Sequence, residues 1–403
     1  MNYLADKSYL ALRTQASPTV VEIPNVFAPL ISESIRVNPN FTADRRLKGL
    51  SWKTDELLRG ARFIEGDLTV WADPDILSHL FNMVYAKGVT TGSLADGYTH
   101  PFTVGEGKFY TLEIPRGDYA QRIWGARGEN LKVSFQDNKM QAVLSIKALG
   151  QFYTAGLAVA LTGAGMTSLV MKTNYDLRPT DGLVAGDKLI VGGVEITITS
   201  LNADGKTVNF GATTVTAAVG DPIYLKAQTP SFPALAEPLY LGNTLVGIAA
   251  TSALAVTAAG AKATASPCYN LSFEFKNNLL SEPASGSTGP SVLLNQVREA
   301  AIELSRLFEN PTQYQKWLEY VKQAITVITT GRFIKSDLTT SEKMTVNFHS
   351  VKLMTNEQPL ESGQYIFDKQ KFESLYDAGD GKAVEVTIIN KTSGDDLGDD
   401  DSI

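Results

Sequence analysis

Apolar and polar residues alternate along several short stretches of the chain, which is the period-two pattern of β-strands with one buried face. The stretches fall into two groups, one in each half of the sequence. The pattern therefore predicts two mainly antiparallel β units. The stretches are 109–114, 131–136, 140–149, 269–278, 342–354 and 383–390.

A helical pattern follows an Asx-Pro pair in each half. Asp73-Pro74 and Asn310-Pro311 each combine a good N-cap residue with a proline at the first helical position. Apolar residues then recur at helical spacing, which predicts two helices with one apolar face each. The residues of these faces are Ile76, Leu77, Leu80, Phe81 and Val84 in the first helix, and Tyr314, Trp317, Leu318, Val321 and Ile325 in the second.

The order strand–strand–helix–strand–strand thus occurs twice. The segment 297–308 has helical propensity, but its position before Asn310-Pro311 favours a strand. Between the two units, Leu183–Ala227 reads as short strands separated by Gly and Asp turns, which is typical of a small β-barrel or sandwich. We therefore expect a mainly β fold with a few helices.

The expected division has four parts. Residues 1–156 form the first unit with an extended N-terminal segment, and residues 157–228 form the inserted β module. Residues 229–392 form the second unit, and residues 393–403 form an acidic flexible tail.

Composition fits a globular protein, since 43% of the 403 residues are hydrophobic and 20% are charged. The net charge is −7, but five of the negative charges are Asp residues in the last nine positions, which leaves −2 for the rest. A basic cluster spans Arg45–Arg62, with six basic residues, and a solvated loop is its simpler interpretation. No secretory signal is expected, and Leu245–Gly260 is too short and too rich in Ala, Thr and Gly for a membrane span.

Candidate chemistry is sparse. Of the three histidines, His79, His100 and His349, the first and the last have no partner at the spacing of a metal site, and surface or interface roles are expected for these two. Segment 200–207 ends like a phosphate-binding loop but lacks its first glycine, and its Asp-Gly pair predicts a hairpin turn. The single Cys268 is expected to be a buried small residue. We predict no catalytic, cofactor-binding or metal-ligating residue, and hence a protein that is not an enzyme.

Neither β unit has enough strands to close a barrel alone, so each would leave open edges. Pairing of each edge with the next copy closes a ring, and loops that leave the ring plane allow rings to stack. Two long segments stand at the same place in each half, Thr42–Gly60 and Lys276–Gln296, and are candidates for stacking loops.

The order of several segments resembles the tail tube proteins of long-tailed bacteriophages, of the type with a duplicated tube domain. The segments span about 320 residues and leave the middle insertion unmatched. In the first half they are IPNVFAPLISESI, EGDLTVWADPDILSHLF, YTHPFTVGEGKFYTLEI and IWGARGENLKVSFQDNKMQAVLSIKALG; in the second they are LSFEFKNN, PTQYQKWLEYV and QYIFDKQKFESLYDAGDGKAVEVTIIN.

This resemblance implies a structural virion protein of the phage tail, made in the host cytoplasm. Two tube domains per chain would give trimeric rings with pseudo-sixfold symmetry, stacked into the conduit for genome ejection. Its partners would be other copies of itself, the tail terminator, tape measure and baseplate proteins, and passing double-stranded DNA that is not bound specifically. No cofactor and no membrane are implied.

A virion protein for host binding or decoration is the alternative, with the inserted module recognising carbohydrate. A sugar platform needs exposed aromatic side chains. The module offers only Phe210 and Tyr224 within Leu183–Ala227.

Overall fold

The computed structural model describes residues 9–44, 56–173, 178–232, 237–283, 289–308, 310–334, 340–359 and 365–398. Of the side chains, those of residues 40–61 are not described. The fold is mainly β, with 58% of residues in strands and 9% in helices, as the sequence predicts. The described part contains three α-helices, α1 (Pro74–Val84), α2 (Ser252–Ala259) and α3 (Thr312–Leu318), and two short 3-10 turns, η2 (Leu241–Asn243) and η3 (Asp395–Leu397).

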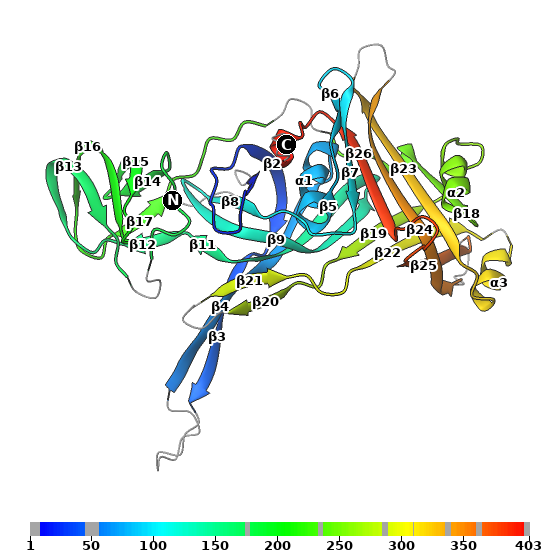
Figure 1. Ribbon diagram of the computed structural model, residues 1–403, viewed down its shortest axis with the longest axis horizontal. Coiled ribbons are helices and arrows are strands. Elements are labelled where there is room, and N and C mark those ends of the chain that lie inside the picture. Colours follow the sequence, from blue (N-terminus) through cyan, green and yellow to red (C-terminus); the bar gives the residue numbers. More distant parts are fainter. Residues whose placement is uncertain are drawn as a thin grey trace.

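Eleven described strands belong to the first half. They are β1 (Tyr9–Thr14), β2 (Val26–Glu33), β3 (Arg36–Asp44), β4 (Glu56–Trp71), β5 (Ala86–Lys87), β6 (Thr91–Ser93), β7 (Gly97–Thr103), β8 (Tyr110–Arg116), β9 (Tyr119–Gln136), β10 (Lys139–Ala148) and β11 (Gly150–Phe152). Helix α1 packs against the two of them labelled β7 and β9 in Figure 1. The expected alternation is present around Leu131 in β9 and along β10, where Leu144 is buried, whereas β8 is buried on both faces.

The second half carries α2 and α3. Its strands are β18 (Thr244–Ala249), β19 (Asn270–Lys276), β20 (Leu280–Pro283), β21 (Pro290–Leu294), β22 (Glu299–Leu307), β23 (Gln323–Phe333), β24 (Ser341–Glu357), β25 (Phe367–Leu375) and β26 (Val384–Asn390). The ambiguous segment before Asn310 is strand β22, as its position predicted. Leu271, Phe273 and Phe275 of β19 face the core.

The two halves share six strand pairings, which explains the repeated sequence pattern. In the first half these are β1–β8, β8–β9, β9–β10, β9–β11, β10–β4 and β4–β2. In the second half the same pairings are β18–β23, β23–β24, β24–β25, β24–β26, β25–β22 and β22–β19. Helix α1 follows β4 and α3 follows its counterpart β22, so each Asx-Pro pair marks the same point of one topology.

Hydrogen-bonded strands also join the halves to each other. β9 pairs antiparallel with β19, and β26 pairs antiparallel with β7. One hydrophobic core accordingly includes residues of both halves, from Leu10 to Ile388.

The inserted module is a closed six-stranded β-barrel at one end of the molecule (Figure 1). Its strands are β12 (Thr154–Gly156), β13 (Leu161–Val170), β14 (Lys188–Val191), β15 (Val194–Leu201), β16 (Thr207–Ala217) and β17 (Pro222–Leu225). The Asp204-Gly205 pair forms the turn between β15 and β16, where the Asp204 carboxylate accepts hydrogen bonds from the backbone of Lys206 and Thr207. The expected hairpin turn is confirmed.

The second helix differs from its expectation. α3 begins at Thr312 and has only seven residues, and Ile325 belongs to strand β23. Tyr314 and Leu318 are exposed, because few side chains of the same chain cover this helix. The expected five-residue apolar face is therefore wrong, although Trp317 does pack against the core.

The C-terminal segment also differs in part from the expected flexible tail. Residues Ser393–Gly398 form a turn in which Leu397 is fully buried. The Asn82 side chain on α1 donates a hydrogen bond to the Leu397 carbonyl at 2.8 Å. Residues 399–403 lie outside the described part.

Candidate assembly interface

Eight strands form a continuous path through both halves, in the order β2–β4–β10–β9–β19–β22–β25–β24. The first four come from the first half and the last four, in the same relative order, come from the second half. All seven neighbouring pairs are antiparallel. We call this set the eight-strand sheet.

The registers of these pairs define two rows of residues that cross the whole sheet. The first row lies on the core face and is apolar throughout: Leu30, Val70, Ala142, Val133, Phe273, Ile302, Phe372 and Leu353. The second row lies on the opposite, outward face: Ser32, Thr69, Val143, Lys132, Glu274, Ala301, Glu373 and Lys352. Position by position, the first four members of each row correspond to the last four.

The internal junction, where β9 meets β19, is closed by aromatic packing and by one buried amide. The ring of Phe275 on β19 lies 5.2 Å from Phe81 and 5.6 Å from Tyr85, measured between centroids. Asn277 donates from Nδ2 to the carbonyls of Val84 and Gly128, at 2.6 and 3.0 Å. The C-terminal end of α1 thus covers the seam between the halves.

Charges on the outward face are nearly balanced. Its described side chains include seven lysines and eight carboxylates, a net charge of −1. They are Lys132, Lys139, Lys147, Lys276, Lys352, Lys369 and Lys371, and Glu65, Asp67, Glu129, Glu274, Glu299, Glu303, Glu357 and Glu373. Several of these are paired, as Lys371 with Glu303 at 2.9 Å and Lys147 with Glu129 at 2.6 Å.

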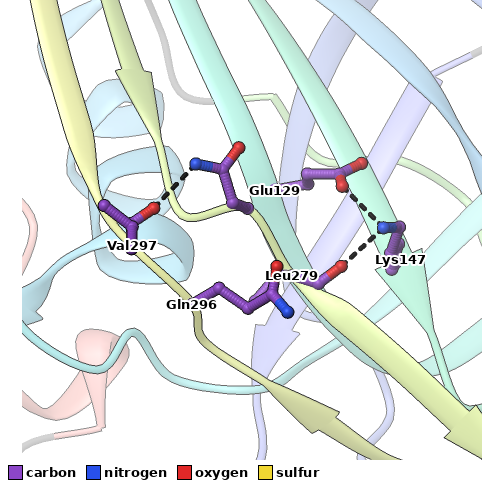
Figure 2. Close-up of a pocket in the computed structure, with 6 residues that line it drawn as sticks. Glu129, Lys147, Leu279, Gln296 and Val297 are labelled. Atoms are coloured by element: carbon purple, nitrogen blue, oxygen red, sulfur yellow. Dashed lines mark hydrogen bonds and ion pairs between the residues drawn. The ribbon is translucent and has the colours of Figure 1, made fainter.

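A broad hollow opens on this face where β20 and β21 leave the sheet (Figure 2). Lys147 donates to the Glu129 carboxylate and to the Leu279 carbonyl, each at 2.6 Å. Asn278 donates to the Val297 carbonyl at 2.7 Å. Because these polar groups already satisfy one another, the hollow does not offer convergent free groups to a small ligand.

Both ends of the eight-strand sheet are open in the described part of the chain. On β2, residues Leu30–Glu33 pair only with β4, and on β24, residues 352–357 pair only with β25. Each edge exposes a large apolar side chain, Ile31 at 41% and Met354 at 47%. Unpaired strand edges with exposed apolar residues are surfaces for pairing with another chain.

Helix α3 lies beside the open edge of β24. Trp317 Nε1 donates to the Met354 carbonyl at 3.1 Å, and Lys352 lies over the ring of Tyr320. Leu318 is nevertheless 56% exposed, and Tyr320 is exposed as well. An apolar surface therefore continues from the strand edge onto the helix.

The described parts of the two candidate stacking loops belong mainly to β-hairpins. β3 and the first part of β4 pair over Arg36–Asp44 and project from the body (Figure 1). β20 and β21 form the shorter counterpart. The tip of the long hairpin, including Arg45 and Arg46 of the basic cluster, lies outside the described residues.

A second cleft opens where β4 ends and α1 begins, and Asp73 and His79 line it. The Asp73 carboxylate caps α1 by accepting from the Ile76 backbone at 2.9 Å, as predicted, and burial raises its pKa to about 7. His79 is 1% exposed and burial lowers its pKa to about 4, while its Nδ1 faces the Tyr110 hydroxyl at 3.2 Å. Within the described residues, no group of three or more His, Cys, Asp or Glu could hold a metal ion.

The surface role expected for His79 is wrong, because its side chain is only 1% exposed. His79 and His100 are buried, and one ring nitrogen of each has a polar partner inside the fold. His100 Nε2 lies 2.9 Å from the Asn390 amide oxygen. His349 Nδ1 lies 2.7 Å from an Asp380 oxygen that also accepts from Ser252. Here the carboxylate sits between serine and imidazole, so the imidazole cannot take the serine proton as a triad base does.

Cys268 is partly buried. Its thiol donates to the Asn270 carbonyl, and burial raises its pKa to about 11. A thiol with so high a pKa is a poor nucleophile at neutral pH.

The barrel is attached to the first half through a buried ionic group that sequence reasoning missed. Arg122 on β9 donates to Glu113 at 3.0 Å and to Asp187 of the barrel at 2.5 Å, and all three side chains are buried. Burial alone would lower the pKa of Arg122, but the two carboxylates outweigh it and raise the pKa. No local pattern signals this group, because Asp187 is distant in sequence.

The two aromatic residues within Leu183–Ala227 do not form an exposed platform. Phe210 is buried, and the Tyr224 ring stacks on Tyr119 of β9 at 4.1 Å. Neither Phe210 nor Tyr224 therefore supports a sugar-binding platform.

No family model and no curated protein matches this chain. No described helix is both long and apolar enough to span a membrane.

Proposed function

We propose that the protein is a structural subunit that assembles into rings and stacked tubes, of the kind found as tail tubes in long-tailed bacteriophages. The observation that carries this proposal is the eight-strand sheet. Two units of the same topology already pair edge to edge within one chain, and no described strand pairs with residues 30–33 or 352–357 at the two outer edges, apart from their inner neighbours.

Repetition of the same edge contact between chains would produce a heterologous, head-to-tail assembly. Such contacts close into a ring when the rotation between neighbouring units divides a full turn. The number of copies comes from the resemblance, which implies three chains and hence six units per ring. Closure would also remove the exposed edges, which otherwise promote uncontrolled pairing.

The outward face of the sheet suits a conduit for DNA. A lining that neutralises phosphates would hold the polymer by counterion release. A face with net charge −1, on which Lys147, Lys276 and Lys371 already pair with carboxylates, would bind duplex DNA weakly. We propose that this face lines the lumen, and that the genome passes without specific binding.

The long hairpin of β3 and β4 would then contact the next ring. It extends away from the body, where it can reach a neighbour along the tube axis (Figure 1). The tail terminator, tape measure and baseplate proteins remain the partners that the resemblance implies, and the virion is the corresponding location. No catalytic step is proposed.

Electron microscopy of the concentrated purified protein tests this function. We expect hollow tubes, or rings with three copies and six similar units. Duplex DNA should not bind these assemblies in a salt-dependent way at low ionic strength. A protein that remains monomeric at every concentration, also in the presence of a macromolecular crowding agent, would contradict the proposal.

A further inference from the structure

We propose, on the basis of the ring assembly above, that strand β24 of one copy pairs antiparallel with β2 of the next copy in one defined register. Leu353 lies opposite Leu30 of the neighbour, and Lys352 lies opposite its Ser32. The contact between copies thus reproduces the contact between the two halves of each chain.

The internal junction supplies the template for this register. There, Val133 of β9 lies opposite Phe273 of β19 on the core face, and Lys132 lies opposite Glu274 on the outward face. The pairing is antiparallel. On the far sides of the junction, β9 pairs with β10 and β19 pairs with β22.

Topology identifies which residues correspond. In the first half, β9 is the last of the four strands β2, β4, β10 and β9, and Val133 is its residue in the core-facing row. In the second half, β24 is the last of the four strands β19, β22, β25 and β24, and Leu353 is its residue in the same row. The chain of registers from Leu30 through β4 and β10 to Val133 repeats step by step from Phe273 through β22 and β25 to Leu353. Leu30 therefore corresponds to Phe273, and Ser32 corresponds to Glu274.

Irregularities in the ladders limit the register to these two pairs. Both edge strands contain a break in register, at Leu30/Ser32 on β2 and at Leu353/Thr355 on β24. A one-residue slip would turn apolar Leu30 and Leu353 toward opposite faces, since successive side chains in a strand alternate. The requirement that both leucines lie on the core face thus excludes the neighbouring registers.

The surfaces beside the two strands fit this contact. The side chains of Leu318 on α3 and of Tyr320 just after the helix are exposed beside β24, in the position where the end of α1 covers the internal seam. Phe275, which α1 covers, corresponds to Glu33 on β2, and Glu33 already pairs with Arg116. The seam between copies is therefore more polar than the internal one, as suits a contact between subunits that fold separately.

Disulfide trapping tests the register. The test variant carries Ser32→Cys and Lys352→Cys with Cys268→Ser, so that the only thiols are those of the proposed pair. Directly opposite residues of an antiparallel ladder have Cα atoms about 4.5–5.5 Å apart, within the range a disulfide spans. We expect oxidation of assembled protein to link the majority of chains into covalent closed trimers.

A matched control moves one partner along the same face of β24. Ser32→Cys with Glu357→Cys places the thiols more than about 10 Å apart in the proposed register, beyond disulfide reach. A second control, Lys132→Cys with Glu274→Cys, should close within one chain and leave its size unchanged. Preferential cross-linking of the Glu357 pair would overturn the register.

A measurement on the unmodified protein covers the case in which the variants do not assemble. Hydrogen exchange of assembled and monomeric protein should show new protection at residues 30–33 and 352–357 in the assembly. Rings with neither this protection nor the expected cross-link would overturn the inference while leaving the proposed function intact. Absence of any ring would contradict the proposed function itself.

Discussion

Helices α1 and α3 occupy the same point of one repeated topology, yet they differ in length and in burial. α1 has eleven residues, and ten of them are buried. α3 has seven residues, and only Gln313 is buried. Both follow an Asx-Pro pair, so this sequence pattern alone does not account for the difference.

The difference follows from what each helix covers. α1 lies over the seam between the two halves, where Phe275 of the second half packs against its end. α3 lies beside an edge that no strand of the described chain pairs with. Tertiary packing supplies most of the stability of a helix, so a helix without a partner surface is short and exposed.

Removal of an aromatic ring from the internal seam should have the largest effect. Phe275→Ala deletes a fully buried side chain and should lower the free energy of unfolding of the monomer by about 3–5 kcal/mol. Leu318→Ala, on the exposed side of α3, is the matched control and should change it by less than about 0.5 kcal/mol. Denaturant unfolding of unassembled protein measures both values. Similar losses at the two sites would mean that α3 is as well covered as α1.

The barrel offers a second comparison between buried and exposed contacts of the same chemistry. Arg122→Ala leaves Glu113 and Asp187 buried without their cation and should destabilise the protein by about 3–5 kcal/mol. Arg178→Ala breaks an exposed pair with Asp181 and should cost at most about 1 kcal/mol. Thermal melts of both variants compare them. A negligible loss at Arg122 would show that the barrel is not held by this group.

The ionic group that attaches the barrel affects how a barrel-deletion variant must be designed. Replacement of Leu157–Gln228 by a short Gly/Ser linker would leave the Arg122 and Glu113 charges without Asp187 in a partly apolar surface. A deletion that tests whether the barrel is needed for tubes should therefore also replace these two residues by apolar ones of similar size. Tube formation by that variant is expected.

The N-cap residue of α1, Asp73, should make the free energy of unfolding depend on pH. The Asp73 pKa is raised to about 7, above its unfolded value near 3.8, so the folded state holds a proton that the unfolded state has lost between those values. Stability should then be fully present below about pH 4 and fall as the pH rises to about 7, by up to about 4 kcal/mol.

Asp73→Asn is the control for this effect, since Asn keeps a capping acceptor but does not titrate. Melting temperatures at pH 5 and pH 8 should show a fall for the wild type relative to Asp73→Asn. Parallel changes in the two proteins would mean that Asp73 does not titrate in this window.

The sequence predicted those features that depend on local chemistry. The alternation of Leu271, Phe273 and Phe275 predicted a half-buried strand, and the Asp204-Gly205 pair predicted a hairpin turn. The extent of α3 could not be predicted, because Val321 and Ile325 continue its helical spacing although Val321 lies in the connection after the helix and Ile325 lies in strand β23. Spacing alone does not distinguish the two when neighbouring segments are both apolar.

The candidate interface was predictable only in outline. Too few strands per unit predicted open edges, but not which strands would be open. The junction of β9 with β19 joins residues about 140 positions apart, as Lys132 and Glu274 show, and no local pattern encodes such a pairing. The buried Arg122 group and the seam residue Asn277 escaped prediction for the same reason, since their partners come from distant segments.

The smallest effect is expected at the start of α3. Asn310 does not cap this helix; its side chain accepts a hydrogen bond from the Thr312 backbone at 3.0 Å in an exposed turn, and Pro311 stands at the cap position. Asn310→Ala should therefore cost less than about 0.5 kcal/mol, as for an exposed surface change. Asp73→Ala should cost about 1 kcal/mol at pH 5, where the protonated carboxyl still accepts from the Ile76 backbone. Thermal melts of the unassembled variants separate the two cases. Equal losses would mean that both Asx-Pro pairs cap their helices in the same way, and that the contrast between α1 and α3 lies only in what covers them.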